Sequence, residues 1–234
     1  MPRGLFVSDL HLFARRSLGL SEVAQFDRLA ASADYFVFGG DIFDFTWSRL
    51  PSQSATATAA AEWLEARMAA APNCRFDYLL GNHDHHELFL AHLERLSHQY
   101  ENFHWDPYLL RRDNQVFLHG DVADGHVTPE RLEASRKKRL KHRTMPRLLD
   151  SVYDAAILAR AHTVTAKVFH PHRRVAKRIL SYLERLEMTP GTGVTDVYFG
   201  HTHVGMDNFD FQGVRFHNGG APIRGVPFRV VAIP

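Results

Sequence analysis

Short apolar runs alternate with longer stretches of helical character along most of the chain. The runs are rich in β-branched and aromatic residues, which is typical of buried strands, and they lie at residues 5–7, 35–38, 78–80, 116–118 and 197–199. Between the first three runs, residues 21–33 and 56–71 are predicted helices, the second composed mainly of strong helix formers. Strands that alternate with helices indicate a layered α/β fold.

The C-terminal third of the chain has a different pattern. Residues 207–211 and 214–217 alternate like the strands of a hairpin around a Gly-containing turn, and residues 228–233 are a predicted last strand. Within residues 175–186 and 148–159, apolar side chains recur at helical spacing. We therefore predict a single domain, residues 1–234, with an inserted helical subdomain at residues 126–190, which we call the basic insert.

Composition narrows the class of protein. Of the 234 residues, 45% are hydrophobic and 23% are charged, which excludes a disordered or fibrous chain. The single cysteine, Cys74, excludes an internal disulfide framework and favours a reducing compartment. No run approaches the roughly 18 apolar residues that a membrane-spanning helix needs, and a charge at Arg3 precedes any signal-like apolar core. We expect a soluble, cytoplasmic protein.

Charge is unevenly distributed along the chain. The basic insert contains 15 Lys and Arg residues against 6 Asp and Glu, an excess of +9, whereas the whole chain has a formal net charge of +2. The remainder is therefore acidic, with a net charge of −7. A basic segment on an acidic body suggests contact with an anionic partner, although a solvated helical face has the same composition.

Each of the five predicted strands runs directly into a polar cluster. The clusters are Asp9-Leu10-His11, Gly40-Asp41-Ile42-Phe43-Asp44, Gly81-Asn82-His83-Asp84, His119-Gly120-Asp121 and Gly200-His201-Thr202-His203. In layered α/β folds the carboxyl ends of the strands form the ligand crevice, so we expect these side chains to converge. Taken singly, each cluster could be a turn or a surface pair; the five together point to a common site.

The chemistry of these side chains predicts a metal centre. Seven of them offer carboxylate, amide or imidazole atoms and no thiolate, a mixed set that suits Mn, Fe or Zn. The seven are Asp9, His11, Asp41, Asn82, His119, His201 and His203. Seven ligands are too many for one tetrahedral site but fit two divalent metal ions if one carboxylate bridges, and we expect manganese first.

In order and spacing, the five clusters resemble the pattern of the calcineurin-like metallophosphoesterases. The resemblance implies a four-layer αββα sandwich that hydrolyses phosphoesters by attack of a metal-bridging hydroxide on phosphorus. It also implies that Asp9, His11, Asp41 and His203 hold one metal, with Asp41 bridging to a second metal held by Asn82, His119 and His201. We expect His83 either to stabilise developing charge or to protonate the leaving group. Asp84 either orients a histidine or stabilises a turn, and Asp44 either orients a ligand or begins a helix.

Within that superfamily, the position of the basic insert is similar to that in the UDP-2,3-diacylglucosamine hydrolases of lipid A synthesis, although their third cluster has Arg where this chain has His83. The resemblance implies a pyrophosphate substrate such as a lipid-linked nucleotide, with peripheral membrane contact. The candidate substrate-binding residues are Arg136, Lys137, Arg139, Arg143, Arg173 and Arg174. A phosphodiesterase or nuclease acting on nucleotides or nucleic acid is the alternative. A metal-free scaffold is a remote one, and no protein partner is predicted.

Overall fold

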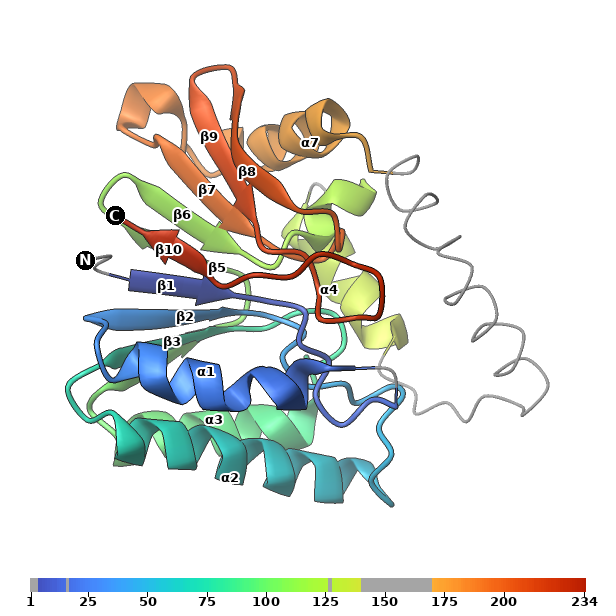
Figure 1. Cartoon of the computed structure of the whole chain (residues 1–234). Helices are drawn as coiled ribbons and strands as arrows, with labels where there is room; N and C mark the ends of the chain where they lie inside the picture. Colours follow the sequence, from blue (N-terminus) through green and yellow to red (C-terminus); the bar gives the residue numbers. More distant parts are fainter. Residues whose placement is uncertain (1–3, 16, 126–127, 140–169) are drawn as a thin grey trace.

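The computed structural model describes residues 4–15, 17–125, 128–139 and 170–234. Two five-stranded sheets form its centre (Figure 1). The first contains, in spatial order, β10 (Val231–Ile233), β1 (Gly4–Val7), β2 (Tyr35–Gly39), β3 (Arg75–Leu79) and β4 (Phe103–Asp106). The second contains β5 (Leu109–Arg112), β6 (Gln115–Leu118), β7 (Asp196–Phe199), β9 (Val214–Asn218) and β8 (Met206–Phe211). Strands β1 to β4 pair in parallel, as do β6, β7 and β9.

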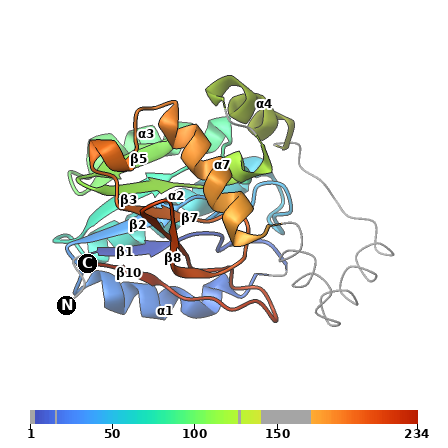
Figure 2. The same ribbon diagram turned by 90° about the horizontal axis from the view of Figure 1, so that it is seen from above.

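Three hydrophobic clusters define the order of the layers. The outer face of the first sheet packs against α1 (Gly19–Ala30), α2 (Gln53–Ala70) and α3 (Glu87–Gln99). The outer face of the second sheet packs against α7 (His172–Glu184), with one leucine from α4 (Pro129–Arg139). A third cluster, which includes Phe6, Phe117 and Tyr198, lies between the sheets. The predicted αββα sandwich is confirmed, and Figure 2 shows α7 crossing above the second sheet.

The predicted strands and helices that lie in the described residues agree with the structure to within a few residues. Sequence analysis missed α3, α4, β4 and β5. Helix α3 buries Phe89, Leu93 and Leu96 on one face. These residues have helical spacing and follow closely after the third polar cluster. Strands β4 and β5 are short and largely half-buried, so they lack the continuous apolar run of a central strand. The last strand is shorter than predicted, because Phe228 forms only an isolated bridge with Gly220.

Only the two ends of the basic insert are described. Helix α4 begins it and α7 ends it, followed by the short turn η2 (Pro190–Thr192). On α7, Val175, Ile179, Tyr182 and Leu183 are buried, as their spacing predicts. The helix predicted at residues 148–159 lies outside the described residues, so the insert as a subdomain stays a prediction. Among the residues described, no helix is both long enough and apolar enough to cross a membrane.

Candidate metal centre

The loops that follow five strands meet at one edge of the sandwich, where hydrogen bonds join each to the next. Beyond β1 and β2 the two loops run side by side, with Asp9 N donating to Gly40 O at 3.0 Å and His11 N to Asp41 O at 2.9 Å. The loop after β3 joins them through His83 N, which donates to Asp41 Oδ1 at 2.7 Å. From the second sheet, His201 N donates to the carboxylate of Asp9 at 2.9 Å. The site is therefore built from both sheets.

Most of the predicted ligands have a strained backbone. Asp9, His11, Asp41, His201 and His203 all lie in the left-handed region, with φ between 46° and 65°. That conformation costs a non-glycine residue about 1–3 kcal/mol and persists only where the surroundings enforce it. Its concentration in five of seven predicted ligands marks these loops as functional.

Two glycines let the carboxylates approach the neighbouring loops. A Cβ added at Gly81 would collide with the carboxylate of Asp41, and one added at Gly200 would collide with that of Asp9. Any side chain at either position would displace an acidic ligand. The glycines of the third and fifth clusters are thus required by close packing at the site.

The first ligand group consists of Asp9, His11, Asp41 and His203. The Nε2 atoms of His11 and His203 are 3.2 Å apart. His203 Nε2 is 3.4 Å from Asp9 Oδ1, and His11 Nε2 is 4.0 Å from Asp41 Oδ2. Two imidazole nitrogens and two carboxylates thus converge on one point, with the side chains of Asp9 and Asp41 almost fully buried.

The second ligand group consists of Asp41, Asn82, His119 and His201. His119 Nε2 lies 3.3 Å from Asp41 Oδ2 and 3.3 Å from Asn82 Oδ1. On the other side of the ring, Nδ1 lies 3.1 Å from Gly39 O; as the donor there, Nδ1 leaves the Nε2 lone pair directed at the group. His201 completes it, since Asp41, His119 and His201 offer ligand atoms within 4.8 Å of one another. Asp41 thus belongs to both ligand groups.

The electrostatics of the buried carboxylates favour a cation. Burial lowers the pKa of His119, but the negative charge of Asp41 outweighs it and raises that pKa to about 10. Burial raises the pKa of Asp41, yet the histidines around it, His119 first, hold the pKa well below the ordinary 3.8. Buried carboxylates that stay ionised need positive charge beside them. The donor set, oxygen and nitrogen without sulfur, is that of Mn, Fe or Zn, so the residues fit divalent metal ions.

Asp44 lies behind two histidines of the site. Its Oδ2 is 3.4 Å from His11 Nδ1 and its Oδ1 is 3.2 Å from His83 Nδ1, while Trp47 N donates to Oδ1 at 2.7 Å. Burial raises the pKa of Asp44, but these two histidines outweigh it and the net shift is downward. Of the two roles predicted for Asp44, the geometry matches the orienting one. The pKa of His83, lowered by burial, is raised by Asp41 and Asp44 to about 9.

Asp84 has a different place from the one expected for a histidine-orienting residue. Its carboxylate accepts hydrogen bonds from Tyr78 Oη at 2.6 Å, Gly81 N at 2.6 Å and Ile42 N at 3.0 Å. These contacts match the alternative, a residue that stabilises the turn after β3. Burial and the charge of Asp41 raise the pKa of Asp84 to about 6. Asp84 therefore holds the loop on which Asn82 and His83 lie.

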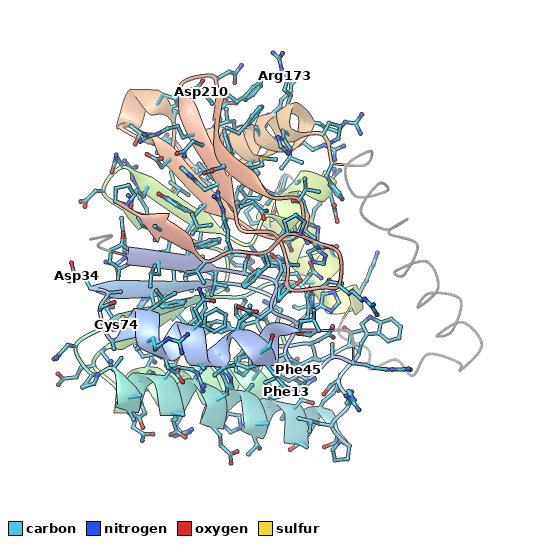
Figure 3. The ribbon with its side chains drawn as sticks, in the orientation of Figure 1. Phe13, Asp34, Phe45, Cys74, Arg173 and Asp210 are labelled. Atoms are coloured by element: carbon cyan, nitrogen blue, oxygen red, sulfur yellow. The ribbon has the colours of Figure 1, made fainter. Side chains whose placement is uncertain are left out.

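The predicted substrate-binding residues whose side chains the structure describes do not form one group. The prediction was wrong for Arg136, which is 1% exposed and donates two hydrogen bonds to the carboxylate of Asp121, at 2.8 Å and 3.0 Å. Lys137 is exposed beside Glu133. Arg173 and Arg174 are exposed on α7. Arg173 lies at the outer end of the molecule (Figure 3), with its guanidinium 5.8 Å from the ring centroid of Phe211 in β8. The side chains of Arg139 and Arg143 lie outside the described part of the chain.

Sequence analysis missed the functional context of two acidic residues in η1 (Asp121–Asp124). Asp121 was noted only as part of a cluster, and it holds Arg136. Asp124 was not noted, and its Oδ2 lies 3.0 Å from His201 Nε2. The available signal was proximity, since η1 begins at Asp121, the last residue of the fourth cluster. A metal-ligating histidine commonly has a carboxylate on its other ring nitrogen.

The two sheets flanked by helices, with shared histidine and aspartate clusters at one edge, define a metallophosphoesterase. Residues 3–205 match the calcineurin-like phosphoesterase family. The chain belongs to this family, and it is a phosphoester hydrolase of the kind that binds divalent metal ions. A comparison with curated proteins finds no match.

Proposed function

We propose that this protein is a dinuclear-metal hydrolase that cleaves phosphodiester or pyrophosphate bonds. The observation that carries the proposal is the position of Asp41, whose carboxylate lies in both ligand groups. In this assignment Asp9, His11, Asp41 and His203 hold one ion, and Asp41, Asn82, His119 and His201 hold the other. Two ions bound there would lower the pKa of a water molecule and withdraw charge from phosphoryl oxygens.

His83 is proposed to protonate the leaving oxygen. It is not needed as a ligand, its side chain is 21% exposed, and it shares a cluster with His11 and Asp41. Asp44 lies against its Nδ1, which leaves Nε2 for the substrate. Burial lowers the pKa of His83, but in the metal-free protein the charges of Asp41 and Asp44 outweigh it and raise that pKa to about 9. A general acid must carry a proton before it donates.

For the substrate, we propose a lipid-linked nucleotide pyrophosphate, with UDP-2,3-diacylglucosamine as the compound to test. The +9 excess of the basic insert supports it, because a pyrophosphate carries two negative charges for such a segment to neutralise. Lys137, Arg173 and Arg174 supply exposed cations there. The same charge would also attract a nucleic-acid backbone, so a phosphodiesterase acting on nucleotides is the second candidate.

The test compares three substrates on the purified, manganese-loaded protein: UDP-diacylglucosamine, its unacylated counterpart and an aryl phosphodiester. Asp41→Asn, which removes the shared carboxylate charge, is the control for contaminating hydrolases. Preference for the acylated substrate would support the lipid assignment. Cleavage of the aryl diester alone would reject that assignment and support the second candidate. Equal activity in wild type and Asp41→Asn would reject the metal assignment itself.

A further inference from the structure

The short helix η1 connects the second ligand group to both described ends of the basic insert. It begins immediately after Gly120 and ends immediately before Gly125, and both glycines have a left-handed backbone. Val122 and Ala123 are buried in the hydrophobic cluster that also contains Val175 and Ile179 of α7. The segment is therefore packed between the metal centre and the outer helix layer. The side chain at one of its ends contacts a predicted ligand, and the side chain at the other end contacts the basic insert.

Toward the metal centre, η1 contacts His201 through Asp124. The distance from Asp124 Oδ2 to His201 Nε2 is 3.0 Å, and the two side chains are 23% and 10% exposed. An ionised carboxylate can only accept, so Nε2 must carry the proton in this contact. The lone pair of the ring is then on Nδ1, which fixes both the tautomer and the rotation of the imidazole.

Arginines from both described ends of the basic insert hold η1 in place. Arg136 of α4 holds Asp121 at the start of η1, through two hydrogen bonds of 2.8 Å and 3.0 Å. Arg178 of α7 donates through Nη1 to the carbonyl oxygen of Ala123, one residue before Asp124. The α4 and α7 arginines thus fix the backbone that places the Asp124 carboxylate.

We propose that Asp124 is a positioning residue for His201, and that Arg178 acts on the metal centre through it. The inference rests on the proposed function, because it takes His201 as a ligand. It gives the basic insert a role that does not require substrate: its helices hold the second ligand group in a metal-binding arrangement. The metal held by Asn82, His119 and His201 is the one affected.

The first experiment measures manganese content and affinity, by elemental analysis and by titration calorimetry of the metal-free protein, alongside activity. Asp124→Ala is expected to weaken the second manganese site by about 10- to 100-fold, the usual cost of losing such a partner. The first site and the melting temperature of the metal-free protein are expected to stay unchanged. Asp124→Asn is expected to restore most of the affinity, because its amide oxygen still accepts from Nε2.

The second experiment is a double-mutant cycle. Arg178→Ala is expected to weaken the same site, and to have little further effect once Asp124 is already alanine, since it acts through that residue. Lys177→Ala, an exposed cation one position earlier on α7, is the matched control and is expected to leave both sites intact. Fully additive effects of the two substitutions would overturn the role of Arg178.

The outcomes separate the inference from the proposed function. If His201→Ala retains two ions at wild-type affinity, the ligand assignment of the proposed function fails. If His201→Ala loses one ion while Asp124→Ala keeps both at full affinity, the positioning role fails and the proposed function stands. If Asp124→Asn loses the ion as completely as Asp124→Ala, the carboxylate charge itself is required, and Asp124 is a ligand instead of a positioning residue.

Discussion

Arg136→Met tests whether the basic insert is anchored by a buried ion pair. Arg136 is 1% exposed, and its guanidinium donates to both oxygens of Asp121 and to Pro107 O at 2.5 Å. Its charge also lies 5.4 Å from the ring centroid of Tyr108. Methionine can replace the aliphatic stem of arginine, so the substitution removes the charge and the hydrogen bonds more than the packing.

The expected loss of stability follows from what remains after the substitution. Asp121 is 4% exposed, so its carboxylate would stay buried without its cation. Removing one partner of a buried pair costs about 3–5 kcal/mol in the free energy of unfolding. For a chain of this size, that loss corresponds to a decrease of roughly 6–20 °C in Tm.

The stability that the Asp121–Arg136 pair contributes also depends on pH, and the pKa of Asp121 determines the sign of this dependence. Burial raises the pKa of Asp121, but Arg136 outweighs it and holds the pKa below the ordinary 3.8. A carboxyl with a lowered folded-state pKa contributes stability that is present above 3.8 and lost as the pH falls through the folded value. The difference in stability between wild type and Arg136→Met should therefore be full at neutral pH and shrink in acid.

The assay is urea unfolding at fixed metal concentration, followed by far-ultraviolet circular dichroism. Lys137→Ala is the matched control, since this neighbouring cation is exposed and should stay within about 0.5 kcal/mol of wild type. The double variant Asp121→Asn with Arg136→Met should recover most of the loss, because no buried charge remains. A change of less than about 0.5 kcal/mol for Arg136→Met would refute the buried-anchor reasoning.

Three further predictions concern the ligand groups. Gly81→Ala should weaken manganese binding in calorimetry without changing any ligand, since its Cβ collides with Asp41; unchanged affinity would contradict the close packing. In urea unfolding, His203→Gly should be more stable than His203→Ala by about 1 kcal/mol, because φ is 54° there. Equal free energies of unfolding would mean that the backbone at this position is unstrained. Metal binding should release protons near neutral pH and tighten as the pH rises, because His119, with a pKa of about 10, must become neutral to ligate. Binding heats that do not depend on the buffer's ionisation enthalpy would argue against this.

The part of the site that was predictable from sequence is the part that lies at strand ends. Asp9, Asp41 and His119 each follow the end of a buried strand within two residues, so sequence order and strand geometry together place them at one edge. The contacts of Asp44, Asp121 and Asp124 were harder to predict from sequence, because their partners are distant in sequence and a carboxylate in a loop has many ordinary roles. Only the fold shows which histidine or arginine each one faces.

Arg136 shows why charge composition is a poor guide to exposure on a short helix. The α4 sequence contains a single leucine in its first turn, Leu132, and a run of basic residues, so nothing in its hydrophobicity indicates a buried face. Yet Leu132 and Arg136 are four residues apart and therefore share one face, and both are buried. The spacing was available, but it becomes informative only once Asp121 is known to lie opposite.

Hydrogen bonds between neighbouring ligand loops maintain the strained backbones of the metal centre. Asp9 and His11 are held in the left-handed region by bonds to the carbonyl oxygens of Gly40 and Asp41, and His201 is held by the carboxylate of Asp9. Each acceptor lies on a loop that carries another ligand. A ligand loop therefore cannot relax without releasing its neighbour, so the strain of about 1–3 kcal/mol per residue is maintained jointly. Because Asp9 comes from the first sheet and His201 from the second, the same bonds that preorganise the centre also fix how the two sheets meet.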